Sequence, residues 1–169
     1  MLDKIAQYLK KVIFPISMVL TVISMLAIIF AILVVVADVI LRRVFRAPIL
    51  GSHDLTMLAF SIIVFLPLGW QAFNDGHIEL DFLVKKFPLK VQRTLEVIMT
   101  FMTTVLLGLM SWRLLALGIM FQERDVATSI LQIPQSPFVF LASLGSIILT
   151  LAFLVRFLKS ISIMIEERR

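Results

Sequence analysis

The stretch Val12–Ala37, VIFPISMVLTVISMLAIIFAILVVVA, contains no charged residue and decides the fold class. As a helix it would be about 39 Å long, which exceeds the roughly 30 Å of hydrocarbon in a bilayer. Helices buried in soluble proteins seldom contain so long an uncharged run. We therefore predict that this segment crosses a membrane.

Three further charge-free stretches follow, at Leu55–Phe73, Val97–Trp112 and Ile130–Val155. The chain has 169 residues, of which 60% are hydrophobic and 16% charged, so four spans leave few residues for a soluble domain. We predict an all-α integral membrane protein with one membrane domain over residues 1–169. Its four transmembrane helices are expected at residues 12–37, 55–73, 95–121 and 137–158.

Basic residues are distributed unequally between the two ends of this expected bundle. The N-terminal segment, the central connection and the C-terminal segment hold eleven Lys and Arg residues, whereas the first and third connections hold five. Segments rich in Lys and Arg stay on the cytoplasmic side of a membrane. We predict that both termini are cytoplasmic.

The segment between the second and third spans, residues 77–94, mixes apolar and charged side chains and is too charged to cross a membrane. Its lysines suit the anionic head groups at a membrane surface. We predict an interfacial amphipathic segment here. The residues expected to have a structural or interfacial role in this segment or just before it are Gly76, His77, Asp81, Lys85 and Lys86.

Several kinds of function conflict with this composition. The chain has no Cys, so it can form neither disulfides nor thiolate metal sites. Its only histidines, His53 and His77, lie in connections predicted on opposite membrane faces, which argues against a shared haem. The basic residues flank apolar runs, which favours a membrane surface over nucleic acid. We expect no catalytic, substrate-binding or metal-binding residue and no cofactor.

Charged residues within or beside the spans have two interpretations each. Asp38 could bind a coupling ion, but Arg42 follows one helical turn later, so a structural pair is favoured within a helix that extends to about Phe45. Arg113 interrupts the third span and could take a direct part in transport, but snorkelling to the outer interface or an ion pair with a neighbouring subunit is favoured. No acidic residue occupies the middle of a span, which argues against an autonomous ion-coupled transporter.

The segments Pro48–Asp54 and Gln132–Pro137 both fall on the predicted outer side, where turn residues lead into helices. Ser52 is expected to cap the second span, and Asp54 suits the positive end of its helix dipole. These segments either connect the spans or form a docking surface for an outside partner. The candidate docking residues are Arg42, Arg43, Arg46, Ser52, His53, Asp54, Gln132 and Gln135.

A series of short motifs occurs in order along the chain: Arg42-Arg43-Val44-Phe45 with Pro48-Ile49, then Ser52-His53-Asp54-Leu55, then Gly76-His77-Ile78-Glu79-Leu80-Asp81-Phe82-Leu83, then Phe87-Pro88, Arg93, and Ile133-Pro134 with Pro137. This order resembles the small, four-span membrane subunit of tripartite ATP-independent periplasmic (TRAP) transporters. One departure is that the family often has Trp-Ser-Glu-Glu-Leu where this chain has Gly-Ser-His-Asp-Leu at residues 51–55.

The resemblance implies a non-catalytic subunit of an uptake system for carboxylate-containing solutes in the bacterial inner membrane. Ion gradients, with sodium expected as the coupling ion, would drive uptake. The implied partners are a large, many-span membrane subunit, whose scaffold this chain would support, and a periplasmic substrate-binding protein. Two alternatives remain open from the residues alone: a small homo-oligomeric channel or exporter, and a membrane anchor of a redox complex.

Overall fold

The computed structural model describes residues 2–74 and 89–166, and its regular elements within those ranges are helices. The chain begins with α1 (Leu2–Ile40), which continues into the π-helical turn η1 (Leu41–Phe45). The later helices are α2 (Ser52–Phe65), α3 (Leu68–Asn74), α5 (Leu89–Glu123) and α6 (Ser136–Glu166). Among the described residues, four stretches are long and apolar enough to cross a membrane: Lys11–Phe45, Ser52–Phe73, Val91–Glu123 and Ser136–Ser162. The all-α, four-span prediction is confirmed.

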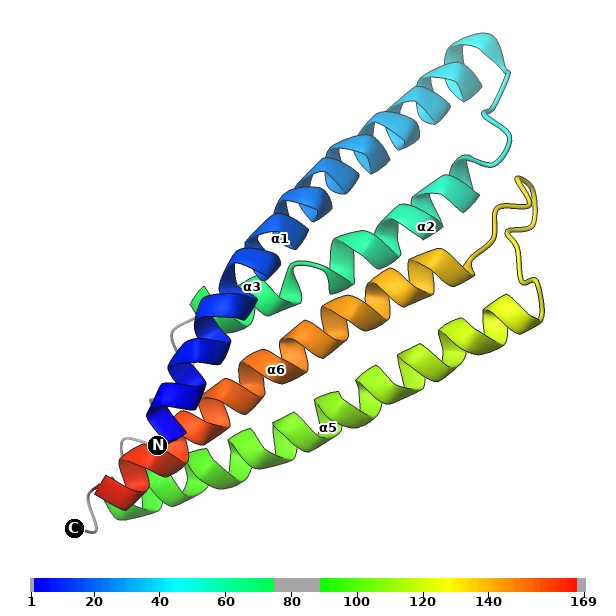
Figure 1. Ribbon diagram of the computed structural model, residues 1–169. Coiled ribbons are helices and arrows are strands. Elements are labelled where there is room, and N and C mark those ends of the chain that lie inside the picture. The colour runs from blue at the N-terminus through cyan, green and yellow to red at the C-terminus, as the bar shows by residue number, and fades with distance from the viewer. Residues whose placement is uncertain (1, 75–88, 167–169) are drawn as a thin grey trace.

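The four spans form a fan of antiparallel helices, and both chain termini lie at the narrow end (Figure 1). α6 contacts α1, α2, α3 and α5, whereas α5 packs mainly against α6. α6 is therefore the central helix of the fold, with α1 and α5 on either side of it (Figure 1). We call the wide end, with connections 46–51 and 124–135, the loop end.

Pro67 divides the second span into α2 and α3. Because proline has no N–H, the carbonyl of Ile63, four residues earlier, loses its helical donor. The Ser24 hydroxyl on α1 donates a hydrogen bond to that carbonyl oxygen at 3.3 Å. An unpaired carbonyl is costly inside a membrane, so this hydroxyl makes the break tolerable and joins α1 to the second span.

α6 approaches the same break through Gly145. A Cβ atom placed on Gly145 would lie 2.7 Å from the carbonyl carbon of Phe65, and closer still to its oxygen. The absence of a side chain therefore lets the two backbones meet, as small residues do between membrane helices. The neighbouring Ala142 and Ser146 are also buried on α6.

Hydroxyl groups join α5 to α6. The hydroxyl oxygens of Ser111 and Ser146 are 2.8 Å apart, and that of Thr150 is 3.0 Å from Ser111. Toward the termini, the Ser160 hydroxyl donates to the Glu96 carboxylate at 3.0 Å. Hydrogen bonds of this kind hold helices together in lipid, where the hydrophobic effect between them is weak.

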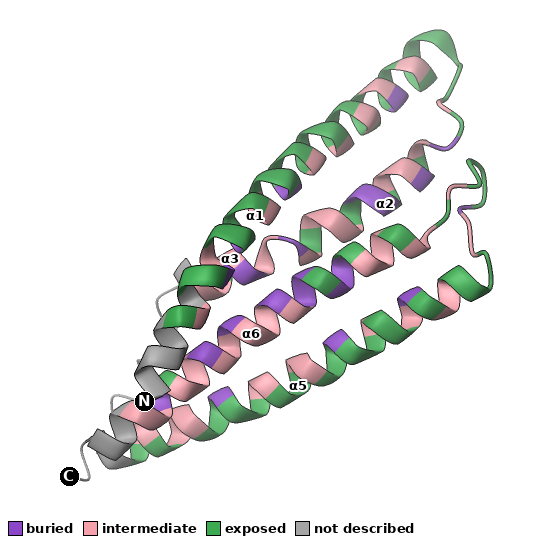
Figure 2. Cartoon of the chain, in the orientation of Figure 1, coloured by how far each residue is buried: buried purple, intermediate pink, exposed green. Residues whose placement is uncertain are grey.

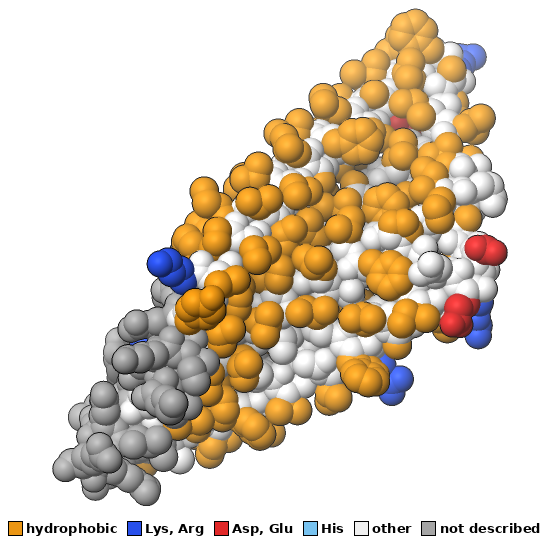
Figure 3. All heavy atoms as spheres, viewed as in Figure 1, with side chains coloured by type: hydrophobic (Ala, Val, Ile, Leu, Met, Phe, Trp, Pro, Cys, Tyr) orange, Lys and Arg blue, Asp and Glu red, His pale blue; other side chains and the backbone are white. Residues whose placement is uncertain are grey.

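The outward faces of α1 and α5 are apolar and uncovered. Figure 2 shows buried residues along α6, whereas α1 and α5 are exposed over most of their length. Hydrophobic side chains cover most of the visible surface between the two ends (Figure 3). A continuous apolar surface of this extent needs lipid or another membrane protein to cover it.

Several predicted boundaries differ from the structure. Ser52 is the first residue of α2 rather than its N-cap, because Gly51 occupies the cap position and no side chain caps the helix. The break at Pro67 within the second span was not predicted. Residues 89–94 belong to α5, which continues directly into the third span. The rest of the predicted interfacial segment, residues 77–88, lies outside the described residues.

Candidate partner-docking site at the loop end

Asp38 holds the end of the first span to the connection that follows it. Its Oδ1 atom accepts a hydrogen bond from the Ile49 N–H at 2.8 Å, and its Oδ2 atom accepts one from the Arg42 guanidinium at 2.6 Å. The predicted pair of Asp38 and Arg42 is therefore confirmed. Both carboxylate oxygens take part in shaping the connection, while the Arg42 side chain stays 62% exposed.

Two residues with positive φ reverse the chain between the first and second spans. Arg46 (φ 53°) ends η1, and Gly51 (φ 84°) precedes α2. A Cβ atom on Gly51 would lie 2.8 Å from both methyl carbons of Leu131 in the other connection. Glycine therefore suits position 51 for its left-handed backbone and for the close approach of Leu131.

Asp54 links the two connections at the loop end. Its Oδ2 atom accepts hydrogen bonds from the backbone N–H groups of Ile130, at 2.8 Å, and Leu131, at 2.9 Å. Asp54 is only 5% exposed. Hydrogen bonds to a charged acceptor are stronger than neutral ones, so this carboxylate anchors the 124–135 connection to the first turn of α2.

The 124–135 connection is also ordered by its own hydrogen bonds. The Thr128 N–H donates to the Ile133 carbonyl at 2.9 Å, and the Gln135 N–H donates to the Val126 carbonyl at 3.0 Å. The side chain of Gln135 donates to the Ala127 carbonyl at 3.3 Å. The segment is therefore a small hairpin fixed at several points, rather than an extended linker.

The eight candidate docking residues lie at the loop end in three different settings. Arg42, Arg43, Arg46, His53 and Gln132 are exposed, Ser52 and Gln135 are half-buried, and Asp54 is buried. Asp54 does not suit a docking role, because its carboxylate is turned inward to backbone donors. We call the exposed set Arg42, Arg43, Arg46 and His53 the basic rim. Basic atoms beside the end of α1 are visible in Figure 3.

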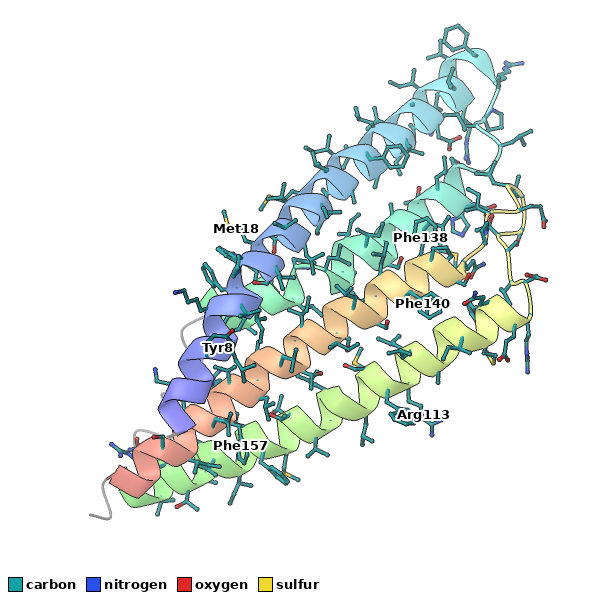
Figure 4. All side chains as sticks on the ribbon, in the orientation of Figure 1. Tyr8, Met18, Arg113, Phe138, Phe140 and Phe157 are labelled. Atoms are coloured by element: carbon teal, nitrogen blue, oxygen red, sulfur yellow. The ribbon has the colours of Figure 1, made fainter. Side chains whose placement is uncertain are left out.

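Arg113, the other described candidate, lies away from the loop end. Its side chain is exposed on α5 and points away from α6 (Figure 4). Within the part of the chain that the structure describes, it forms no hydrogen bond or ion pair. The candidates Gly76, His77, Asp81, Lys85 and Lys86 fall outside the described residues.

The described residues do not form a cluster of metal-binding side chains. Over residues 2–74 and 89–166, the structure contains no group of three or more His, Asp or Glu side chains that could hold a metal ion. Asp38 and Asp54 at the loop end instead bind backbone N–H groups and Arg42.

The fold and its loop end define a class, that of small helical membrane proteins with four spans and two connections joined at one end. A family model described as "Tripartite ATP-independent periplasmic transporters, DctQ component" matches residues 31–162. This match covers most of the chain, so the chain belongs to that family, the small membrane component of TRAP transporters. The resemblance found in the sequence is confirmed. No curated protein gives a significant match to this chain.

Proposed function

We propose that this chain is the non-catalytic small membrane subunit of an uptake system for carboxylate-containing solutes, driven by an ion gradient and coupled to sodium. It would lie in the bacterial inner membrane with both termini in the cytoplasm. In this proposal the chain supports the scaffold of the large membrane subunit. Membership of the DctQ family supports the proposal.

The placement of polar groups within the spans is the main evidence that this chain supports another subunit rather than transports a solute itself. The hydroxyls of Ser24, Ser111 and Ser146 bond to a backbone carbonyl or to one another across helix contacts. A site for a coupling ion or a carboxylate solute needs polar groups that converge on a cavity near the membrane midplane. Here these hydroxyls join the helices, and the large outward surfaces are apolar apart from Arg113, as suits a companion subunit.

The basic rim supports a second part of the proposal, docking of the periplasmic substrate-binding protein. In the proposed topology the rim faces the periplasm. Asp38 and Asp54 hold the connections beneath it, so its positive charge lies on an ordered platform. Clustered exposed arginines attract an acidic surface and speed its association.

Reconstitution tests the proposed function. Proteoliposomes with the chain, its large membrane subunit and the binding protein should accumulate a labelled carboxylate solute when an inward sodium gradient is imposed. Vesicles with the chain alone should accumulate none, and vesicles that lack only this chain should lose uptake. Uptake by the chain alone, or undiminished uptake without it, would contradict the proposal.

The docking role needs its own variants. Arg43→Glu combined with Arg46→Glu reverses two charges of the basic rim, and should lower uptake most at limiting concentrations of binding protein. Arg124→Glu is the matched control, because Arg124 is also exposed at the loop end but lies outside the basic rim. If the double variant and the Arg124→Glu control gave equal uptake at every concentration of binding protein, the basic rim would have no docking role.

A further inference from the structure

Arg113 lies on the outer face of α5, and the contacts between α5 and α6 show how far along the bundle it lies. Ser111 meets Ser146, and a Cβ atom on Gly118 would lie 2.9 Å from the ring of Phe140. Between these two antiparallel contacts, Arg113 lies level with about Gly145. Gly145 in turn lies against the carbonyl group of Phe65, within the second span. Arg113 is therefore level with residues inside two other spans, about a third of the way along α6 from the loop end.

Snorkelling of Arg113 toward the loop end would have to cover a long distance along either helix. Gly145 is nine residues inside the start of α6 at Ser136, which is about 14 Å along a helix. On its own helix, Arg113 is ten residues from the end at Glu123, or about 15 Å. An arginine side chain is shorter than either distance, so snorkelling alone would not bring its guanidinium to the end of either helix.

The face of α5 around Arg113 has the residue spacing of a helix contact. Met99, Met102, Leu106 and Leu109 precede Arg113 at alternating steps of three and four residues, and each exposes at least 60% of its surface. The small residue Ala116 follows on the same face and is also exposed. This spacing forms a straight stripe along which a second helix can pack.

Charge complementarity decides what can cover this stripe. Lipid tails offer no anion at this depth, because the phosphates of lipids lie at the surface. A second copy of the chain offers no acidic partner at this depth, since its charge-free runs contain no Asp or Glu. A helix of a different membrane protein can bring a carboxylate, and charges inside membranes are paired in this way.

We propose that the Arg113 stripe of α5 is the contact surface for a spanning helix of the large membrane subunit, and that Arg113 pairs with a carboxylate on that helix. The inference rests on the proposed function for the identity of the partner. The stripe supplies apolar packing on both sides of the pair, and Arg113 fixes the register of the two helices.

Co-purification tests this contact. A tagged chain is co-expressed with the large membrane subunit of its transport system and purified in mild detergent, and the ratio of the two proteins is measured. Arg113→Leu and Arg113→Glu should each lower recovery of the large subunit about tenfold or more, because each leaves the buried carboxylate unpaired. Leucine is more favourable than arginine inside a membrane helix, so Arg113→Leu should not prevent the chain from folding. A loss of the large subunit with this variant therefore reports on the contact. Arg124→Glu should leave recovery unchanged.

Charge exchange and cross-linking give independent measurements. Replacing the partner carboxylate by arginine should restore recovery of the large subunit with Arg113→Glu. The chain contains no native cysteine, so single cysteines at Leu106 and Leu109 should cross-link to the large subunit. Absence of both cross-links would overturn the contact.

The outcomes separate the two proposals. If the unaltered chain and the large subunit do not co-purify, the proposed function fails. If they co-purify and both Arg113 variants retain the large subunit fully, only the Arg113 contact is wrong. A change in co-purified anionic phospholipid, with unchanged recovery of the large subunit, would assign Arg113 to a lipid contact and also overturn the inference.

Discussion

Asp54 and Arg113 are both charged residues of spanning helices, and they lie in opposite surroundings. Asp54 is buried at the loop end and bonds to two backbone N–H groups of the other connection. Arg113 is exposed within the third span, ten residues from its loop end, and no described residue pairs with it. A charge with partners in its own chain explains how the chain folds. A charge at this depth without one indicates where a second polypeptide binds.

The same contrast separates the inner face of α6 from the outer face of α5. Glycine and serine residues of α6 contact the backbone of α2 and the hydroxyls of α5. The outer face of α5 instead presents Leu106, Leu109 and Trp112 to the surroundings. Substitutions on the inner face should change the stability of the isolated chain, and those on the outer face should change assembly.

Gly145→Ala should have the largest effect on stability. The added methyl would meet the backbone of Phe65, which cannot move as a side chain can, and we expect a loss of about 2–3 kcal/mol. Gly108→Ala is the matched control, because its Cβ would only reach ordinary contact with Thr150, at 3.8 Å. Denaturation in mixed micelles measures both. Equal stability of the two variants would show that α6 does not approach α2 so closely.

Asp54→Ala should have the next largest effect. It leaves the N–H groups of Ile130 and Leu131 without their acceptor, and we expect a loss of about 2 kcal/mol. Hydrogen exchange at these two amides should become faster in the variant, under conditions in which the amides of the helices remain protected. His53→Ala, one residue away and exposed, should change neither property. If both substitutions destabilise the chain alike, the link between the connections is not specific to Asp54.

Ser111→Ala should have a smaller effect, about 1 kcal/mol, because it removes the contacts of one hydroxyl with Ser146 and Thr150. Leu109→Ala is the comparison on the outer face, two residues earlier on the same helix. It should leave the stability of the isolated chain nearly unchanged, because Leu109 is 64% exposed. A larger effect for Leu109 than for Ser111 would reverse the assignment of the two faces of α5.

The spans and the pairing of Asp38 with Arg42 could be predicted from the sequence, because both depend on residues close together in the chain. Long charge-free runs predict membrane helices through composition alone. Two oppositely charged residues one helical turn apart meet on any regular helix. The family could be identified for a similar reason, because short motifs and their order along the chain can be read without knowing the fold.

The internal role of Asp54 could not be predicted, because its partners Ile130 and Leu131 are more than seventy residues away. Their backbone N–H groups carry no side-chain signal in the sequence. The break at Pro67 had a signal, the proline itself, but the donor that satisfies Ile63 comes from α1. The depth of Arg113 likewise follows only from the register between α5 and α6.

Arg113→Leu should have the smallest effect on the isolated chain, within about 0.5 kcal/mol of the unaltered protein, because no described residue depends on Arg113. The same variant should lose the large membrane subunit during purification, so one substitution separates stability from assembly. The measurement is denaturation of the isolated chain beside recovery of the complex. Strong destabilisation of the isolated chain would mean that Arg113 contributes to its fold, and the contrast with Asp54 would then disappear.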